Sequence, residues 1–275
     1  MSATLARSQN LEQTYALARD AYQKGDYQQA VSYYSRVLFF DRKQAYTRLI
    51  FEDLAESHFQ MEDYRDASFF FDIAYNLETK SQSSRNELLL KRALCYVYLE
   101  EYQIALRDIY LLENPDSLTA RQAALLEGMC QFRLANFEEA RDPLSQALKD
   151  KSDTVLIVEN YRKLEKINRK SPKKAKVFSM IIPGSGLMYV GDWKNGSSSL
   201  ILVGGLTSLM VISTINTGFV NAFLNVAPWY QRYYMGGFKL TENVARDKLD
   251  TRRLRLLQKM VNDIGQANTQ GVSQE

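Results

Sequence analysis

The order of apolar and polar residues divides the chain into two parts of different character. Between residues 11 and 150, apolar positions recur at helical spacing, and one frame of small and aromatic residues repeats four times. From Asn195 to Gln231 the chain has no charged residue at all. That run is far longer than the roughly 20 apolar residues that one membrane-crossing helix needs. The pattern predicts an all-α protein in which a helical repeat array is followed by an apolar helical segment.

The repeating frame predicts four helix pairs. In each copy a small residue stands nine positions before an aromatic residue, and a second small residue follows three positions later. The four sets are Ala18, Tyr27 and Ala30; Ala55, Tyr64 and Ala67; Ala93, Tyr102 and Ala105; and Gly128, Phe137 and Ala140. The small residues let two helices approach closely, and the aromatic residue fills the turn between them. Because one pair cannot bury its apolar face alone, neighbouring pairs are expected to stack.

This frame resembles the tetratricopeptide repeat (TPR) over residues 11–150, although the usual tryptophan is absent and the copies lie 37, 38 and 35 residues apart, against about 34 in the family. The resemblance implies a superhelical solenoid whose first helices line a groove for a protein or peptide partner. Some TPR domains clamp an acidic peptide terminus with lysine and asparagine, but Tyr15 and Arg19 stand at those positions, so the partner class stays open. Projection of the frame places these residues in the groove: Tyr15, Arg19, Tyr22, Glu56, Phe59, Leu94, Tyr98, Met129, Phe132 and Arg133.

The uncharged run is interrupted at Asn216–Gly218, where two spans would need a turn. We therefore expect a membrane hairpin of two helices, about Gly196–Ile215 and about Phe219–Met235. Asn221 and Asn225 are four residues apart, so they share a helix face that is expected to point toward the first span. A hydrogen-bonded helix pair is favoured there over a conduction path lined by the two asparagines.

The segment before the hairpin carries the motif Pro-Gly-x-Gly-x-x-Tyr-x-Gly, with a further glycine five residues on. Its residues are Pro183, Gly184, Gly186, Tyr189, Gly191 and Gly196. With the two apolar helices, residues 172–238 resemble small bacterial membrane hairpin modules of unestablished function. The resemblance implies a membrane location and no chemistry. Tight helix packing is the favoured role of the glycines, with a binding element as the alternative. Residues 177–190 either cross the membrane as a third segment or lie in it as an interfacial or re-entrant one.

The remaining segments are predicted from charge and periodicity. Residues 1–10 lack an apolar run and are expected to be flexible. Residues 151–171 are expected to form a helix that caps the array or joins it to the membrane, followed by a basic linker. Residues 239–275 are predicted to form a basic amphipathic helix that lies on lipid headgroups, packs on the array or is solvated, with a disordered tail after Gly265.

Charge is distributed unevenly along the chain. Residues 1–160 carry 18 Lys/Arg against 25 Asp/Glu, and residues 161–275 carry 17 against 7. Basic groups that flank apolar spans favour anionic lipid headgroups over nucleic acid as a partner. Two basic flanks and two spans place the array and the C-terminus on one side, predicted to be the cytoplasm of a bacterial inner membrane. A signal peptide removed upstream would instead place the array in the periplasm.

No recognised arrangement of residues for catalysis, cofactor binding or metal binding is present in the sequence. Cys95 and Cys130 are too few for a disulfide framework, and His58 has no Cys or His at metal-ligand spacing. We therefore expect no enzyme and no cofactor. The favoured function is a membrane-anchored scaffold that binds an unknown protein or peptide. The alternatives are a small channel, transporter subunit or lipid-handling protein regulated by the array, and a soluble regulator with a buried apolar helix pair.

Overall fold

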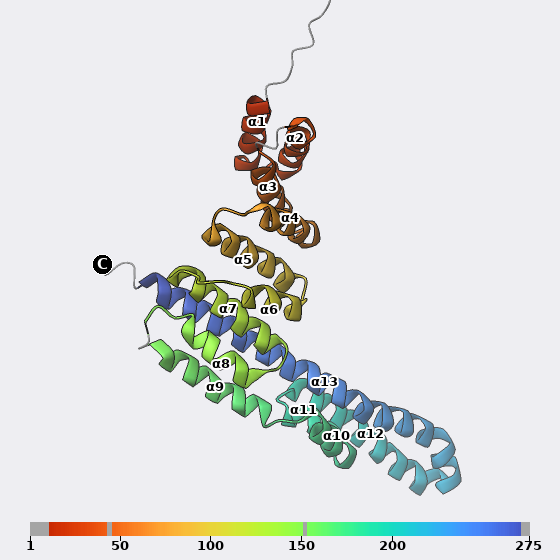
Figure 1. Cartoon of the computed structure of the whole chain (residues 1–275). Helices are drawn as coiled ribbons and strands as arrows, with labels where there is room; N and C mark the ends of the chain where they lie inside the picture. The colour runs from red at the N-terminus through yellow and green to blue at the C-terminus, as the bar shows by residue number, and fades with distance from the viewer. Residues whose placement is uncertain (1–10, 43–45, 151–152, 271–275) are drawn as a thin grey trace, which may run out of the picture. The chain divides into compact units, whose positions relative to one another are not determined.

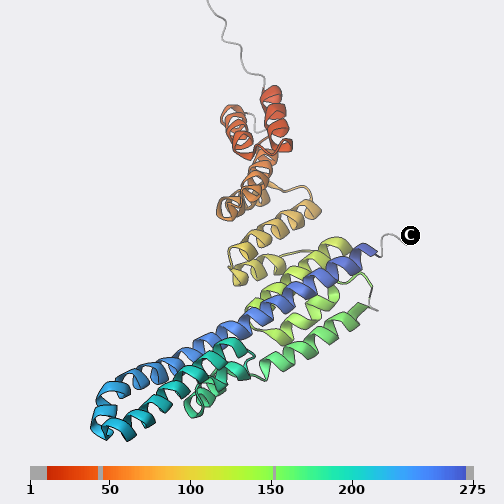
Figure 2. The ribbon, with the colours of Figure 1, turned by 180° about the vertical axis from the view of Figure 1, so that it is seen from behind.

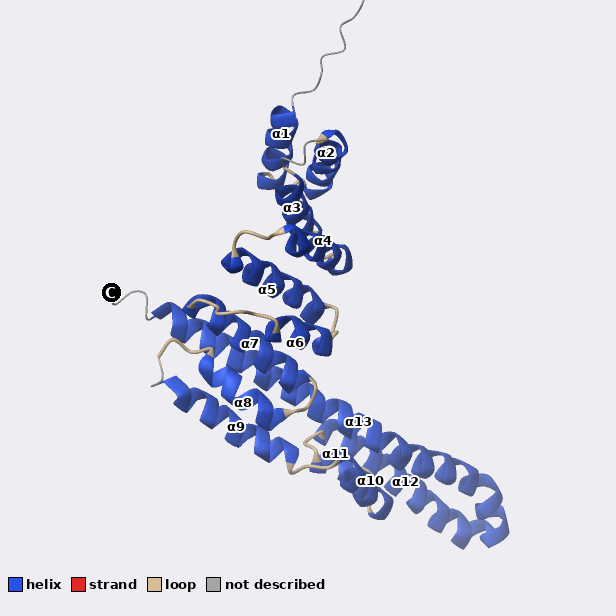
Figure 3. Cartoon of the chain, in the orientation of Figure 1, coloured by secondary structure: helices blue, strands red, loops and turns tan. Residues whose placement is uncertain are grey.

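The computed structural model describes residues 11–42, 46–150 and 153–270, and the regular elements in these ranges are α-helices (Figures 1 and 3). The chain divides into two compact units. The first unit comprises Met1–Thr154 and Gln266–Glu275, and the second comprises Val155–Gly265. The expected flexibility of residues 1–10 lies outside the described residues. The all-α prediction is confirmed.

The first unit is a stack of helix pairs, in which each helix packs against the next (Figure 1). The pairs are α1–α2, α3–α4, α5–α6 and α7–α8, so the predicted repeat array is confirmed. The helices are α1 (Leu11–Gln23), α2 (Tyr27–Phe40), α3 (Thr47–Gln60), α4 (Tyr64–Leu77), α5 (Gln82–Tyr98), α6 (Tyr102–Tyr110), α7 (Ser117–Arg133) and α8 (Phe137–Gln146).

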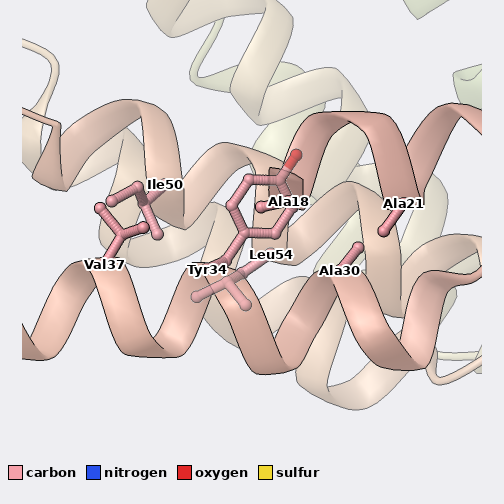
Figure 4. Close-up of a cluster of buried hydrophobic side chains, with 7 residues drawn as sticks. All are labelled: Ala18, Ala21, Ala30, Tyr34, Val37, Ile50 and Leu54. Carbon is pink, nitrogen blue, oxygen red and sulfur yellow. The ribbon is translucent and has the colours of Figure 1, made fainter. Parts of the chain in front are cut away.

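The small residues of the repeat frame lie where the helices cross. Ala18 and Ala30 are fully buried and pack with Tyr34 and Leu54 in one apolar cluster (Figure 4). In the fourth pair, a Cβ atom on Gly128 would lie 2.6 Å from Cγ of Leu144. Close approach of the two backbones therefore requires a small side chain, as the sequence predicts.

The aromatic residue of the frame closes each turn by ring contact. In the first pair, the ring of Tyr27 meets that of Tyr22 edge to face at 5.3 Å, and Phe132 and Phe137 do the same at 5.0 Å in the fourth. The third pair has no aromatic partner in that place, and Tyr102 instead receives the guanidinium of Arg133. In these three pairs the turn is thus filled by a planar group that contacts the aromatic residue of the repeat frame.

The second residue after the first helix adopts a left-handed backbone conformation in every pair. The φ angles are +80° at Gly25, +61° at Glu62, +60° at Glu100 and +64° at Ala135. Asp26 and Asp63 then cap the second helices of their pairs by accepting a hydrogen bond from a backbone N–H. The sharp turn is therefore set by backbone geometry and capping, with glycine used only once.

A buried charged group joins the second and third pairs. The guanidinium of Arg92 on α5 donates two hydrogen bonds to Asp108 on α6, from Nε at 2.6 Å and from Nη2 at 3.0 Å. It also contacts Asp72 on α4. Asp108 has no solvent exposure, and Arg107 supplies a second cation at 3.0 Å. Arg92 thus joins α5 to α6 by a bidentate pair and to α4 by its contact with Asp72.

The last residues of the chain that the structure describes complete the first unit. Asn268, near the end of α13 (Phe219–Gln270), accepts a hydrogen bond from the N–H of Lys149 at 2.7 Å and donates one to the carbonyl of Ala147 at 2.9 Å. The amide thus satisfies backbone groups left open where α8 ends. The prediction of a disordered tail is wrong for Gln266–Gln270, which are helical, and residues 271–275 lie outside the described range.

The second unit contains four further helices and most of α13. The helices are α9 (Thr154–Asn168), α10 (Pro172–Ile181), α11 (Ser185–Tyr189) and α12 (Trp193–Thr217). α12 and α13 turn at Gly218 and run side by side in both views (Figures 1 and 2). A Cβ on Gly237 would lie 3.7 Å from Oγ of Ser199, and both residues are 19 positions from Gly218. The two helices therefore form a symmetric antiparallel hairpin.

The ends of the second unit differ from the expectations in one respect. α13 runs without a break from Phe219 to Gln270, so the basic amphipathic segment is the continuation of the hairpin helix and not a separate element. α9 forms close to its predicted place, and its Asn160 and Asn168 bond Asp263 and Arg253 of α13. These contacts assign α9 to the second unit.

Candidate functional site

A groove lies between the first helices of the third and fourth pairs, in the first unit. Its volume is about 340 Å³. The floor is apolar, and the polar side chains are confined to four positions. The lining residues are Glu87, Leu90, Lys91 and Leu94 of α5, and Thr119, Gln122, Leu125 and Leu126 of α7. An apolar hollow with a few polar groups is the usual form of a binding site. We call it the α5–α7 groove.

An acidic cluster borders the groove on the side of α3. The ammonium of Lys91 lies 2.8 Å from a carboxylate oxygen of Glu56, 2.9 Å from one of Glu87 and 3.3 Å from one of Glu52. Burial lowers the pKa of Lys91, but the hydrogen bonds of Glu56 and Glu87 outweigh this effect and leave the pKa raised. The ammonium therefore stays charged, and three carboxylates surround it.

Asp53 is a further carboxylate on α3, the helix that carries Glu52 and Glu56. The hydroxyl of Tyr15 on α1 donates a hydrogen bond to Asp53 on α3 at 2.8 Å. Burial, together with the charge of Asp53, raises the pKa of Tyr15 to about 12. Burial also raises the pKa of Asp53, and the charges of Glu52 and Glu56 raise it further. Asp53 therefore adds a third carboxylate to those of Glu52 and Glu56 on α3, with Arg19 nearby.

Some of the residues placed in the groove from the sequence lie at this site. Leu94 lines the groove, Glu56 belongs to the acidic cluster, and Tyr15 and Arg19 lie near Asp53. Met129 lies one helical turn beyond Leu125 on α7, and Leu125 lines the groove. These residues follow the helix face that the sequence indicates.

The remaining residues that the sequence placed in the groove contact other parts of the first unit. Phe132 is 3% exposed and lies in the core, so it is not available to a partner. Tyr22 and Phe59 pack against the apolar clusters of the first two pairs. Tyr98 is exposed but stacks on Tyr64 at 4.5 Å. Arg133 donates a hydrogen bond to Tyr102 and pairs with a glutamate on the same turn.

Of the residues that line the α5–α7 groove, only Leu94 was predicted from the sequence. On α7 the predicted residues lie toward the C-terminal end, whereas the groove is lined by residues 119–126. Glu87, Lys91 and Leu94 show the i, i+4, i+7 spacing that marks one helix face. That spacing was readable, but no sequence signal shows where along the face two helices diverge.

Three glycines of the motif in the second unit, Gly184, Gly186 and Gly196, lie at contacts between backbones. A Cβ on Gly184, whose φ is +83°, would lie 2.0 Å from the carbonyl oxygen of Gly196. A Cβ on Gly186 would lie 1.8 Å from the carbonyl oxygen of Ala175. α10, α11 and α12 therefore touch backbone to backbone at the motif. This supports tight packing as the role of these glycines, and it gives no support to a binding element.

The second unit exposes a large apolar surface. Within the described residues, one helix is long and apolar enough to cross a membrane, Trp193–Thr217, and almost none of it is buried. The exposed residues of the hairpin include Ile201, Leu209, Ile212, Ile215, Phe219, Val220, Phe223 and Leu224. Exposed apolar patches of this extent mark binding surfaces. The hairpin is therefore the second candidate site.

α13 does not meet the same criterion of length and hydropathy, so the second span is not confirmed. Asn221, Asn225 and Gln231 lower the hydropathy of its apolar part. Both Asn221 and Asn225 are exposed. The expectation that they point toward α12 is wrong for Asn225, which donates a hydrogen bond to the carbonyl of Asn221 in its own helix at 2.9 Å. Asn221 does bond α12, but only at the turn, where it donates to the carbonyl of Thr217, the last residue of that helix, at 3.0 Å. They do not line a path between the two helices.

Residues 177–190 do not form one helix. α10 ends at Ile181, a turn through Pro183 and Gly184 follows, and α11 is five residues long. A continuous crossing by this segment is therefore excluded in this conformation, while an interfacial or re-entrant placement is compatible with it.

The cysteines and the histidine of the first unit are candidates for reactive or metal-binding groups. Cys95 and Cys130 are buried, and burial raises the pKa of each thiol to about 12. Ligand atoms of His58, Asp63 and Asp66 lie within 4.8 Å of one another, an arrangement that the search for Cys and His spacing overlooked. The two aspartates are exposed, and Asp63 already caps α4, so geometry alone assigns no metal there.

Comparison with known proteins supports the assignment of the first unit. The family described as tetratricopeptide repeat matches residues 11–44, which hold the first helix pair. No significant match to a curated protein was found. A solved structure that is similar is a tetratricopeptide repeat protein from Parabacteroides merdae ATCC 43184, with 16% identity, 90% of this chain and 98% of that chain covered, and a TM-score of 0.49. The family match to the first pair and the four packed pairs support a tetratricopeptide-repeat-like solenoid in the first unit.

Proposed function

We propose that this protein is a membrane-anchored, non-catalytic scaffold that holds a protein partner in the α5–α7 groove. The observation that carries the proposal is that the two units present different surfaces, a groove in the first and an exposed apolar hairpin in the second. The first has a partly apolar groove in a repeat array, a fold that typically presents binding surfaces. The second exposes a wide apolar surface on a hairpin that lacks charged residues from Asn195 to Gln231.

The dimensions of the hairpin support insertion into a bilayer. Ser199 and Gly237 lie opposite one another, and 19 residues separate each from the turn. At 1.5 Å per residue, each arm is about 28 Å long beyond that point, close to the roughly 30 Å of a hydrocarbon core. Tyr233 is exposed toward the base of the hairpin, where aromatic side chains favour the membrane interface.

α10 fits an interfacial position beside the hairpin. Its ten residues extend about 15 Å, which is too short to cross the membrane. Ile181 and Ile182 are exposed, and the hydroxyl of Tyr234 donates a hydrogen bond to the carbonyl of Met180 at 2.5 Å. That bond holds the apolar end of α10 at the base of the hairpin. Lysines at the other end of α10 would meet anionic headgroups.

The charge pattern supports one orientation. Basic residues flank the hairpin on both sides, and its turn is uncharged. We propose that both units' polar parts face the cytoplasm of a bacterial inner membrane. Translocation of the array by an upstream signal peptide is the alternative outcome of a topology test.

Membrane anchoring is tested with the full chain and charged variants of the hairpin. The wild-type chain should pellet with membranes and resist carbonate extraction. Leu209→Asp combined with Ile212→Asp should be extracted, because each central charge costs roughly 3 kcal/mol in lipid. Phe69→Asp, which changes an exposed residue of α4, is the control and should remain bound. Release of the wild-type chain by carbonate would end the membrane proposal and favour a soluble regulator.

Partner binding is tested by cross-linked capture from membranes. Leu94→Ala combined with Leu125→Ala removes apolar surface from the groove and should reduce capture about tenfold or more without releasing the protein from membranes. Leu77→Ala is the matched control, since Leu77 is exposed at the end of α4. Equal capture by the three proteins would show that the groove is not the binding surface.

A further inference from the structure

We infer that the α5–α7 groove binds a protein segment that carries a cationic side chain next to apolar ones. The inference rests on the proposed function, because it specifies the partner that the groove would hold. It follows from the contacts of Lys91, the surplus of carboxylates around that residue, and the apolar floor of the groove.

Lys91 is not available to bind an acidic partner. An ammonium has three N–H donors, and this one has three carboxylates within 3.3 Å, those of Glu52, Glu56 and Glu87. Each donor is therefore matched by an acceptor within the protein. An acidic segment would have to displace one of these carboxylates and would then face the others without compensation.

The acidic cluster has more negative than positive charge. Glu52 is shared between Lys91 and Arg48, whose Nη1 lies 3.1 Å from its carboxylate. Asp53 adds a further carboxylate on α3, and Arg19 adds one cation near it. Glu87 is the most accessible member, since 62% of its side chain is exposed. A cation from a partner can therefore bond Glu87 without displacing Lys91.

Apolar side chains of the partner have a place directly beside that cation. Leu90 and Leu94 extend from the same helix as Glu87, and Leu125 and Leu126 face them from α7. A segment that places one cationic residue against Glu87 and apolar residues between the two helices would satisfy both surfaces. This is the chemistry of an amphipathic basic segment.

A neighbouring hollow sets the direction of the segment. This hollow of about 240 Å³ shares Gln122 and Leu125 with the groove and is also lined by Arg121 and Lys149. Two cations, Arg121 and Lys149, thus stand at this end of the groove, whereas the carboxylates that contact Lys91 belong to α3 and α5. The cationic residue of the partner should therefore lie toward α3, and a uniformly basic segment is not favoured.

The test is selection of random peptides, displayed on phage, by the full chain held in nanodiscs. The expected result is enrichment of peptides that combine Lys or Arg with apolar residues. Synthetic copies of the enriched peptides should bind Glu87→Gln up to about fivefold more weakly than wild type, as for an exposed ion pair. The loss should shrink at high salt. Glu138→Gln removes the same charge from an exposed site on α8 and should bind as wild type does.

The outcomes separate the inference from the proposed function. Suppose that the enriched peptides are acidic or uncharged, and that they bind less well to the variant with Leu94→Ala and Leu125→Ala. That result would keep the groove as the binding surface and overturn the inference of a cationic partner. Equal binding of the selected peptides to wild type and Glu87→Gln at low salt would overturn it as well. No enrichment above that seen with the leucine variant would contradict partner binding in the groove itself.

Discussion

Removal of Arg92 should weaken the repeat array more than any surface substitution, because it leaves a buried carboxylate without its main partner. In Arg92→Met, Asp108 keeps no solvent exposure and loses hydrogen bonds of 2.6 and 3.0 Å. Breaking a buried ion pair from one side costs roughly 3–5 kcal/mol. Arg107 remains 3.0 Å from Asp108, so we expect a cost near the lower end, about 3 kcal/mol.

The matched variant removes both charges. Arg92→Met combined with Asp108→Leu eliminates the buried carboxylate and leaves apolar groups of similar size, which is often neutral or stabilising relative to the ion pair. The double variant should therefore be more stable than Arg92→Met alone. This reversal distinguishes an unpaired buried charge from a simple loss of packing, for which the two changes would add.

The assay is thermal unfolding of the full chain, combined with amide hydrogen exchange. For a unit of this size, about 3 kcal/mol corresponds to a fall in Tm of roughly 6–12 °C. Since a repeat array need not unfold in one step, exchange of the amides in α5 and α6 reports the local effect. A single variant within about 1 kcal/mol of wild type, or a double variant less stable than the single one, would refute the reasoning.

Three further predictions concern other parts of the chain. Glu78→Gln should lower the free energy of unfolding at neutral pH, because the backbone N–H of Lys80 lowers the pKa of the Glu78 carboxyl. The stabilisation by Glu78 is full above the unfolded-state pKa and is lost as pH falls through the folded-state pKa, which denaturant midpoints measured against pH would reveal. Gly186→Ala should impair accumulation of the protein because its Cβ meets a carbonyl oxygen at 1.8 Å, whereas Gly204→Ala has open space and should be tolerated in the same immunoblot. Cys95 and Cys130 should resist a maleimide in the folded chain and react after denaturation, because burial raises the pKa of each thiol to about 12; rapid labelling under native conditions would contradict this.

The repeat array was predictable because its signal is local and repeated. Ala18 and Ala30 are fully buried, as their small size in the frame implies, and Tyr27 closes its turn. Each copy repeats the same short-range packing, so four weak signals reinforce one another. The position of the groove was not predictable in the same way, because it depends on the point along α5 and α7 at which neighbouring helices separate.

The hairpin was predictable from the sequence in its turn but not in the orientation of its side chains. Its turn at Gly218 was readable from the break in apolar residues, whereas the orientation of Asn221 and Asn225 was not. Shared spacing shows that the two lie on one face. It does not show which face meets α12. The amide of Asn225 bonds a carbonyl within α13, and that of Asn221 bonds the last carbonyl of α12 at the turn. The continuity of α13 was missed because the return of charge after residue 238 resembles the start of a new element.

The bonds of Asn268 have a consequence for the order in which the protein is completed. The array emerges early from the ribosome, but the backbone groups of Ala147 and Lys149 receive their partner from a residue made about 120 positions later. At a synthesis rate of roughly 5–20 residues per second, that interval is about 6–24 seconds. During that time the hairpin is translated and the array has an unfinished edge. Its last helix pair is therefore the region that a nascent-chain chaperone would meet, and truncation before Asn268 would make that temporary exposure permanent.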